Sequence, residues 1–302
     1  MRQRLCDLLV EQAEDPNLVF LTGDLGFSLL EPLRDALGER FINAGVAEQN
    51  MIGVAAGMAS RGLSVWVYSI APFIYARPFE QIRNDLAFHC LPVVLVGNGG
   101  GYGYGVQGPS HHAIEDYGVL LTLPDMYVYL PVFDDDLSSV VDRAALSTNP
   151  VYIRLGRDER PPNFDPPPYA PWRQLVDGGG PVIAVAGPLA GTYIADLTSI
   201  PASERPKLWA VSELPLSQNP PPPAFLAQVE SSGGVLAVEE HVRRGGFGAE
   251  LLQYFVDNGV SVNAFRHLYA RCHNYGRYGS QHHLRRLSGL DPDSVIRHAK
   301  GC

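Results

Sequence analysis

Short runs of β-branched and other apolar residues alternate with stretches of helical pattern along the first half of the chain. Apolar runs of this length, bounded by turn residues, are typical of strands that are buried on both faces. We predict strands at Leu18–Leu21, Phe41–Asn43, Val65–Tyr68, Val93–Gly97, Met126–Leu130 and Val151–Leu155. Helices are predicted between them at Gln3–Ala13, Ala47–Ser60, Phe73–Phe88 and Asp135–Leu146. This alternation favours an α/β fold with a parallel sheet.

A proline-rich stretch divides the chain. Proline has no amide hydrogen and cannot continue a helix or a central strand, so we interpret residues 160–178, which begin with Arg160–Pro171, as an extended linker. The pattern then restarts, with strands predicted at Val182–Ala186, Leu208–Val211 and Val235–Glu239, helices at Gly248–Asn258, Gln281–Leu287 and Pro292–Lys300, and a loop at Pro215–Pro223. We therefore predict two domains, 1–159 and 179–302, each a mostly parallel sheet with helices on both faces.

The composition argues against several classes of protein. The net charge of −9 disfavours a nucleic-acid partner, because phosphate binding needs a basic surface. No apolar run approaches the length of a membrane span, about 20 residues, and the N-terminus shows no signal pattern, so we expect no membrane association. The four cysteines lie far apart and form no Cys-x-x-Cys pair, which favours a reducing cytoplasm and predicts neither a disulfide framework nor a metal site.

The segment Asn43–Gly53 carries one carboxylate, Glu48, at the start of a predicted helix that is otherwise small and apolar. Small residues allow that helix to pack close to a neighbour, and a carboxylate in such a place is costly unless another group pairs with it. An ordinary salt bridge would provide the pairing. The alternative is a carboxylate with a role in catalysis or cofactor binding.

Two further segments follow predicted strands. Ser69–Arg83 opens a helix and contains Phe73, which by itself is typical of an ordinary core residue. The glycine-rich segment Gly99–His112 follows the strand Val93–Gly97 and ends in a pair of histidines. Within it, Gly103–Gly108 is a literal G-x-G-x-x-G, but the Pro-Ser-His-His after it is a poor start for a pyrophosphate-binding helix, so a nicotinamide or flavin site is not favoured.

These segments together resemble the transketolase-like thiamine diphosphate enzymes. Gly45–Gln49 matches the family's G-I/V-A-E-Q segment, and Gly105–His111 resembles its G-x-D-G-x-[ST]-H loop at the mouth of the active site. In the second half, Val238–His241 followed by Gly245–Gly248 resembles V-E-E-H…G-G-[LF]-G, and Arg277–Ser280 resembles R-F-G-x-S. The resemblance covers the whole chain and implies a pyrimidine-binding domain followed by the family's C-terminal domain.

The resemblance also implies roles for single residues. Glu48 would bond the N1′ nitrogen of the cofactor's aminopyrimidine ring and thereby activate the cofactor, and Phe73, with Tyr75 as the reserve candidate, would stack on that ring. His111 would contact the oxygen atoms of the substrate. The other residues implicated are Asp24 at the cofactor and Ser28, Gln107 and Arg157 at the substrate.

Two of these positions leave alternatives open. Gln107 stands where the family usually has an acid that helps to select the hydroxyl configuration of the donor sugar, which puts the usual donor specificity in question. Arg157 matches the arginine that grips the sugar phosphate, and a planar guanidinium suits bidentate phosphate contact. A surface ion pair with Asp158 or Glu159 is the alternative for Arg157.

Full-length members of the family begin with a domain that holds the diphosphate through a divalent metal, marked by Gly-Asp-Gly and a later asparagine. This chain has Gly23-Asp-Leu25 and no such unit. We therefore expect a split enzyme, in which this chain is the smaller subunit. Its partner, the N-terminal diphosphate-binding subunit, would bind Mg²⁺ and share thiamine diphosphate with it, in an α2β2 heterotetramer.

Three functions follow from these expectations. The first is transfer of a two-carbon ketol unit from a ketose, in particular a phosphorylated one, to an aldehyde acceptor. The second keeps the cofactor and changes the donor: a subunit resembling the β chain of 2-oxo acid dehydrogenases, or an acyloin-forming enzyme that transfers an acetyl group from pyruvate. The third is a non-catalytic, regulatory paralogue, which the presence of Glu48 and His111 disfavours.

Overall fold

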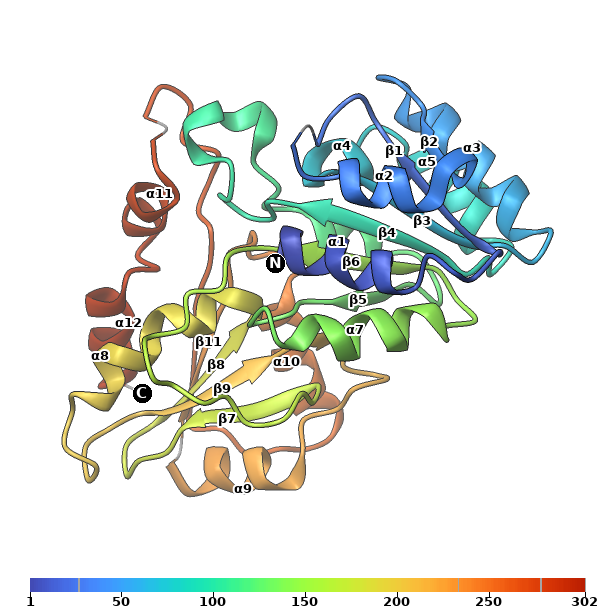
Figure 1. The fold of residues 1–302 in the computed structure, drawn as a ribbon. Coiled ribbons are helices and arrows are strands. Elements are labelled where there is room, and N and C mark those ends of the chain that lie inside the picture. Colours follow the sequence, from blue (N-terminus) through green and yellow to red (C-terminus); the bar gives the residue numbers. More distant parts are fainter. Residues whose placement is uncertain (27, 233, 278, 302) are drawn as a thin grey trace.

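Two α/β units, each built on one sheet, make up the computed structural model, which describes residues 1–26, 28–232, 234–277 and 279–301 (Figure 1). Tyr278, in the Arg277–Ser280 turn of the sequence pattern, lies outside the described residues. The two sheets lie in different parts of the molecule, and helices cover both faces of each (Figure 1). The α/β fold class expected from the sequence is thereby confirmed.

The first sheet has the strand order β10-β5-β6-β4-β3-β1-β2. Its strands are β1 (Leu18–Thr22), β2 (Phe41–Asn43), β3 (Ser64–Ile70), β4 (Val93–Asn98), β5 (Tyr127–Tyr129), β6 (Val151–Leu155) and β10 (Glu213–Leu214). Strands β1 to β6 are paired in parallel. The short β10 comes from the second half of the chain and adds to this sheet antiparallel to β5. All six strands predicted for the first half are therefore present.

Helices from the first half cover the two faces of this sheet. On one face lie α1 (Arg2–Glu11), α2 (Glu31–Leu37) and α7 (Asp136–Ala145), with the short η1 (Gly38–Arg40) after α2. On the other face lie α3 (Glu48–Ala59), α4 (Ala71–Tyr75) and α6 (Asp116–Leu120). Each strand alternates its side chains between two apolar cores, which explains why these strands are apolar at almost every position.

The single helix predicted over Phe73–Phe88 is wrong. The segment is divided into α4, α5 (Phe79–Gln81) and a π-helical stretch, η2 (Ile82–Ala87). Pro78 is the N-terminal cap of α5, and a proline inside a helix removes a hydrogen bond and clashes with the preceding turn. The break therefore follows from one residue whose effect the apolar periodicity concealed.

The second sheet has the strand order β12-β11-β8-β9-β7. Its strands are β7 (Trp172–Val176), β8 (Val182–Ala186), β9 (Lys207–Val211), β11 (Gly234–Val238) and β12 (Ala264–Leu268). All pairs are parallel except β7, which runs antiparallel to β9. Strand β7 lies inside residues 160–178, so this range is a linker only up to Pro171. Its charged and amide residues, Arg173 and Gln174, gave no strand signal in the sequence.

The helices of the second half have three locations. Helices α9 (Pro223–Ser232) and α10 (Phe247–Asp257) cover one face of the second sheet, and η5 (Gly187–Tyr193), α8 (Ile194–Thr198) and α12 (Pro292–Ala299) cover the other. Helix α11 (Gln281–Ser288) stands apart, next to the loop that follows β4 (Figure 1). Its Leu284 packs with Tyr102 and Ile114 of that loop.

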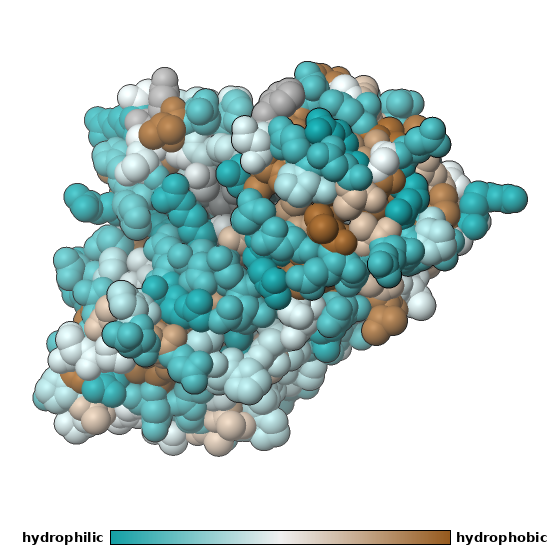
Figure 2. Space-filling model, viewed as in Figure 1, coloured by the Kyte–Doolittle hydropathy of each residue, from teal (hydrophilic) through white to brown (hydrophobic). Residues whose placement is uncertain are grey.

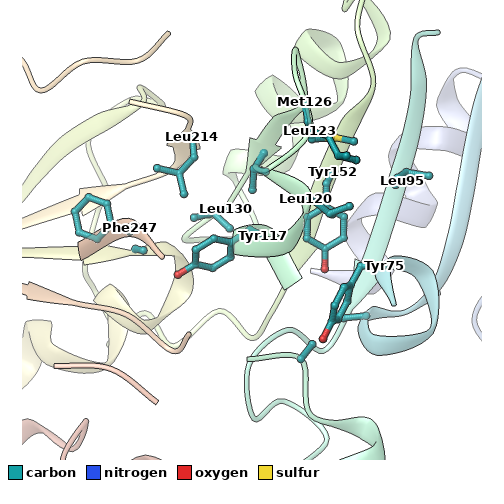
Figure 3. Packing of buried hydrophobic residues seen from close by; sticks show 14 of the residues in the cluster. Tyr75, Leu95, Tyr117, Leu120, Leu123, Met126, Leu130, Tyr152, Leu214 and Phe247 are labelled. Carbon is teal, nitrogen blue, oxygen red and sulfur yellow. The ribbon is translucent and has the colours of Figure 1, made fainter. Parts of the chain in front are cut away.

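One apolar core, which we call the joint core, is shared by the two units. It runs from the α3 face of the first sheet to the α9 and α10 face of the second. Figure 3 shows Tyr117 and Leu130 of the first half lying between Tyr152 and Phe247. Because the core is continuous, the two units are packed together through a buried apolar surface rather than joined only by the linker.

The face of the molecule seen in Figure 1 is mostly polar, with apolar residues scattered singly (Figure 2). Isolated apolar residues on a surface are common and carry no argument by themselves. Across the described ranges, no helix combines the length and the apolar character that a membrane crossing would require.

A buried ionic network lies where the two units meet. The Arg285 side chain donates from Nε to Glu240 Oε2 at 2.7 Å and from Nη1 to Glu159 Oε1 at 2.6 Å. Burial alone lowers the pKa of Arg285, but the Glu240 and Glu159 carboxylates outweigh this and raise it above its usual value. Burial likewise raises the pKa of Glu159, yet Arg285 outweighs burial and holds the pKa of this carboxyl below its usual value. Both carboxylates therefore depend on one guanidinium.

Replacing Arg285 with methionine should destabilise the chain by about 3–5 kcal/mol, because the buried Glu240 and the partly buried Glu159 would lose their shared partner. Urea unfolding followed by circular dichroism measures the change. The neighbouring Arg286 is exposed, and Arg286→Met serves as the matched control, with an expected change below about 0.5 kcal/mol. Equal effects of the two substitutions would show that the network does not stabilise the fold.

Candidate functional site

Glu48 is the first residue of α3 and is only 5% exposed. The strand β2 ends five residues earlier, and Gly45, with φ of 71°, turns the chain from the strand towards the helix. The Glu48 carboxylate is paired: Arg77 Nη1 donates to Glu48 Oε1 at 2.7 Å. The sequence predicted that a carboxylate at this position needs a partner, and Arg77 is that partner.

Arg77 also covers an aromatic ring. Its guanidinium carbon lies 3.8 Å from the centroid of the Phe73 ring. The other neighbour of Phe73 is His111, whose ring meets it edge-on with the centroids 5.2 Å apart. Ser110 Oγ lies 3.0 Å from His111 Nδ1. Glu48, Phe73, Arg77 and His111 thus form one contiguous group, the Glu48 cluster.

The sheet brings the Glu48 cluster together. Glu48 follows β2, Phe73 follows β3, and His111 lies in η4 (Pro109–His111), on the loop that follows β4. These strands belong to one parallel sheet, so their carboxyl ends meet at the same edge, where ligands bind in open α/β sheets. Three segments far apart in the sequence therefore converge on one place.

An open cavity of about 440 Å³ lies beside Glu48. Its lining residues are Val46, Ala47, Glu48, Gln49, Asn50 and Arg77. Val46 is 76% exposed, so an apolar side chain stands at the rim of a cavity that contains a buried carboxylate. This combination suits a flat heteroaromatic ring that donates a hydrogen bond to a carboxylate and shields its faces from water.

A second cavity of about 550 Å³ contains two of the residues predicted for the substrate, Gln107 and Arg157. Arg2, Tyr104 and His282 line it as well. Since the Tyr104 ring also contacts the His111 ring, with the centroids 6.1 Å apart, Tyr104 connects this cavity to the Glu48 cluster.

Arg157 makes no ion pair with any carboxylate in the part of the chain that the structure describes. The two carboxylates considered as its surface partners are engaged elsewhere. Asp158 accepts from the backbone amides of Asp134 and Arg160, and Glu159 accepts from Arg285. The guanidinium of Arg157 is exposed and borders the second cavity, so it can meet an anionic ligand there.

Two predicted residues on the loop after β1 lie outside both groups. Asp24 is exposed and accepts from Asn43 Nδ2 at 3.2 Å. Ser28 is exposed with φ of 64°, and its amide donates to Glu31 Oε1 at 2.7 Å. Neither is hydrogen-bonded to the Glu48 cluster in the described part of the chain.

Tyr75, the reserve candidate for stacking, is part of the joint core instead (Figure 3). Its hydroxyl donates to Glu115 Oε2 at 3.3 Å, and Glu115 Oε1 lies 2.7 Å from His273 Nε2. Burial raises the pKa of Tyr75. Burial also acts to raise the pKa of Glu115, but hydrogen bonding and charge, chiefly from His273, leave that pKa below its usual value. Of the two aromatic candidates, Phe73 is the one that contacts Arg77 and His111.

The glycine-rich loop is shaped by close packing rather than by a phosphate. A Cβ at Gly105 would collide with the backbone of Gly279 and Gln281, and one at Gly103 would lie 2.8 Å from the Cα of Gly99. Close packing therefore explains Gly103 and Gly105, and the third glycine of the segment, Gly108, has φ of 82°. His112 is buried beneath this loop, and burial lowers its pKa.

The sequence analysis missed Arg77 and Tyr104 as members of the site. Arg77 lies within the segment Ser69–Arg83, four residues after Phe73. That spacing is about one helical turn and was the available signal. Tyr104 lies inside the glycine-rich loop, where no periodic pattern indicates which way a side chain points.

The chain matches the family model described as transketolase, pyrimidine binding domain, over residues 7–162. It is 30% identical over 304 residues to an apulose-4-phosphate transketolase subunit of Phocaeicola vulgatus, covering 99% of this chain and 96% of that protein. It is 30% identical over 316 residues to a putative transketolase C-terminal section of Methanocaldococcus jannaschii, with coverages of 98% and 94%. A solved split gene transketolase, described as an inactive beta4 tetramer, superposes with a TM-score of 0.83 at 28% identity, covering 99% and 97%.

The fold is thus that of an α/β protein whose candidate functional residues gather at the carboxyl edge of its first sheet. The chain belongs to the transketolase family. The resemblance stated from its sequence motifs is confirmed.

A substitution separates a functional Glu48 from a structural one. Glu48→Gln should change the free energy of unfolding by less than about 1 kcal/mol, because Arg77 is 42% exposed and such pairs add little to stability. Urea unfolding of the isolated chain provides the measurement, with Arg77→Gln unfolded in parallel as the other half of the pair. A loss above about 2 kcal/mol for Glu48→Gln would identify the carboxylate as part of the folding core.

Proposed function

We propose that this chain is the smaller subunit of a split, thiamine diphosphate-dependent transketolase. The observation that carries the proposal is the Glu48 cluster, in which a buried carboxylate, an aromatic ring and an imidazole meet at the carboxyl edge of a parallel sheet. The relatives named as a transketolase subunit and as a transketolase C-terminal section support this assignment. The proposed domains, 1–159 and a C-terminal domain, meet at the joint core.

The residues present suit the pyrimidine ring of the cofactor. Glu48 would hold a proton or hydrogen bond at N1′, and Phe73 would support one face of the ring. When bound there, thiamine diphosphate would supply the nucleophilic carbon that ketol transfer requires. Glu48 is well placed for its part because it is nearly buried, and low solvent access strengthens a hydrogen bond to it.

His111 and the second cavity would bind the substrate. His111 can donate a hydrogen bond to a substrate oxygen. Its ring contacts the rings of Phe73 and Tyr104. Gln107 would hydrogen-bond a donor hydroxyl through a neutral amide, and Arg157 would bind a phosphate group. The reaction proposed is the transfer of a two-carbon ketol unit from a ketose phosphate to an aldehyde.

Asp24 and Ser28 stay predictions of the sequence resemblance. Both lie on the loop after β1, at the same edge of the sheet as Glu48. Asp24 would contribute to the cofactor site and Ser28 to the substrate site, and each would act when the partner subunit brings its own residues to this edge.

The partner subunit would bind the diphosphate and Mg²⁺, and two copies of each chain would form an α2β2 complex. The solved relative described as an inactive beta4 tetramer supports the idea that a chain of this kind associates with itself without its partner. We propose that the same holds here, so that activity requires both subunits.

The first experiment is co-purification with the partner subunit, followed by calorimetric titration of thiamine diphosphate with Mg²⁺. The pair should bind the cofactor and the isolated chain should not. Glu48→Gln should lower the turnover of the pair by at least about 100-fold, since it removes the carboxylate that acts on the ring. Unchanged turnover of this variant would exclude Glu48 as the activating group, and absence of cofactor binding by the pair would contradict the proposed function.

Arg157→Ala should act selectively on phosphorylated donors. The value of kcat/KM should fall by about 10- to 100-fold for ketose phosphates, because a charge-assisted hydrogen bond is lost. The matched control is the corresponding ketose without phosphate, which should react equally well with both proteins. The same assay includes pyruvate, the donor that Gln107 would fit in an acyl-transferring enzyme. Equal losses for all donors would contradict a phosphate role for Arg157.

A further inference from the structure

Arg77 occupies the place between Glu48 and Phe73 that the proposed function gives to the pyrimidine ring. It donates to the Glu48 carboxylate at 2.7 Å, and its guanidinium covers the Phe73 ring at 3.8 Å. These are the two contacts that the aminopyrimidine ring would make with the same two residues. The 3.8 Å separation is ordinary van der Waals contact, so no second flat group fits between the guanidinium and the ring.

A guanidinium is a close chemical match for such a ring. It is planar, donates hydrogen bonds in its plane to a carboxylate, and stacks on aromatic faces. In the cofactor-free chain it would keep the Glu48 carboxylate paired, which offsets the cost of leaving that charge almost buried. It would also keep the Phe73 face out of water. Both partners would thus be held in position before the cofactor arrives.

The arrangement is built to be reversible. The Arg77 side chain is 42% exposed and borders the open cavity of about 440 Å³ beside Glu48. In the described part of the chain, Glu48 is the only carboxylate paired with it. The residue is tethered through its backbone, because Gln49 Nε2 donates to Arg77 O at 3.4 Å. The side chain can therefore swing into the cavity while the main chain stays in place.

We propose that Arg77 is a positioning residue that stands in for the pyrimidine ring and is displaced when thiamine diphosphate binds. The proposal rests on the proposed function, because it needs the cofactor ring to bind at Glu48 and Phe73. Binding then proceeds from chains in which Arg77 has moved away. The apparent affinity is therefore the intrinsic affinity multiplied by the fraction of chains in that open state.

The test measures cofactor binding by the complex of the two subunits, with no turnover involved. Arg77→Ala and Arg77→Gln are compared with the unmodified complex by stopped-flow fluorescence and calorimetry with thiamine diphosphate and Mg²⁺. Without the guanidinium, the association rate and the affinity should each rise by about 3- to 10-fold, because every chain is then in the open state. Arg77→Lys keeps the charge and loses the planar group, and its rise should be smaller than that of Arg77→Ala.

Arg83→Ala is the matched control. Arg83 lies in the same segment, is exposed, and donates to Asn84. Its substitution removes one positive charge from the same segment but, within the described part of the chain, no hydrogen bond or ring contact with Glu48 or Phe73, so the association rate should equal that of the unmodified complex. Equal increases for Arg83→Ala and Arg77→Ala would assign the effect to charge alone and overturn the proposal.

The remaining outcomes distinguish a failure of the Arg77 proposal from a failure of the proposed function. Suppose that the unmodified complex binds the cofactor, and that the Arg77→Ala complex binds it at the same rate or with lower affinity. Arg77 then does not compete with the ring, so the proposed displacement of Arg77 is wrong while the proposed function stands. If the unmodified complex binds no cofactor, the proposed function itself fails. Thermal unfolding of the isolated Arg77→Ala chain verifies that a binding change does not come from misfolding.

Discussion

The buried network around Glu240 is the interaction on which the rest of the structure depends. Glu240 follows β11 and accepts from Arg285 at 2.7 Å and from the Tyr102 amide at 2.6 Å. Arg154 of β6 donates to the backbone oxygens of Glu240 and Ala113, both at 2.8 Å, and pairs with a buried aspartate. Charges buried this completely are tolerable only when each is paired, so neither unit can shift without leaving a charge unpaired.

That constraint reaches the candidate site through the loop after β4. Residues Gly99–Ala113 carry Gln107 and His111, and the network holds the loop at Tyr102 and Ala113. Gly101 has φ of 63°, and a Cβ there would lie 2.7 Å from Glu240 Cγ, so glycine is required for this close approach. The Glu-Glu-His motif of the second unit thus has a physical function in the first: it fixes the loop that presents the histidine.

Elements with a strong periodic pattern or a distinctive local motif could be predicted from the sequence. The parallel strands of the first sheet, the helix that begins at Glu48 and the loop that carries His111 were found because each has a strong local signal. The edge strand β12 and the partly polar β7 were missed, because their side chains alternate with charged residues that resemble loop sequence. The partner of Glu48 could not be identified, since which charge meets a carboxylate depends on how β2 and β3 are arranged in space, which no single segment contains.

The pairing of Glu48 with Arg77 explains how an almost fully buried carboxylate is tolerated at the edge of the sheet. Burial of an unpaired charge would oppose folding, whereas a permanent buried pair would leave no place for a ligand. A half-exposed arginine meets both requirements, because its pair with the carboxylate is strong enough to stabilise the charge and weak enough to be exchanged. The sheet edge sets the position of the carboxylate, the network around Glu240 holds the loop that carries His111, and the Arg77 side chain lies between Glu48 and Phe73.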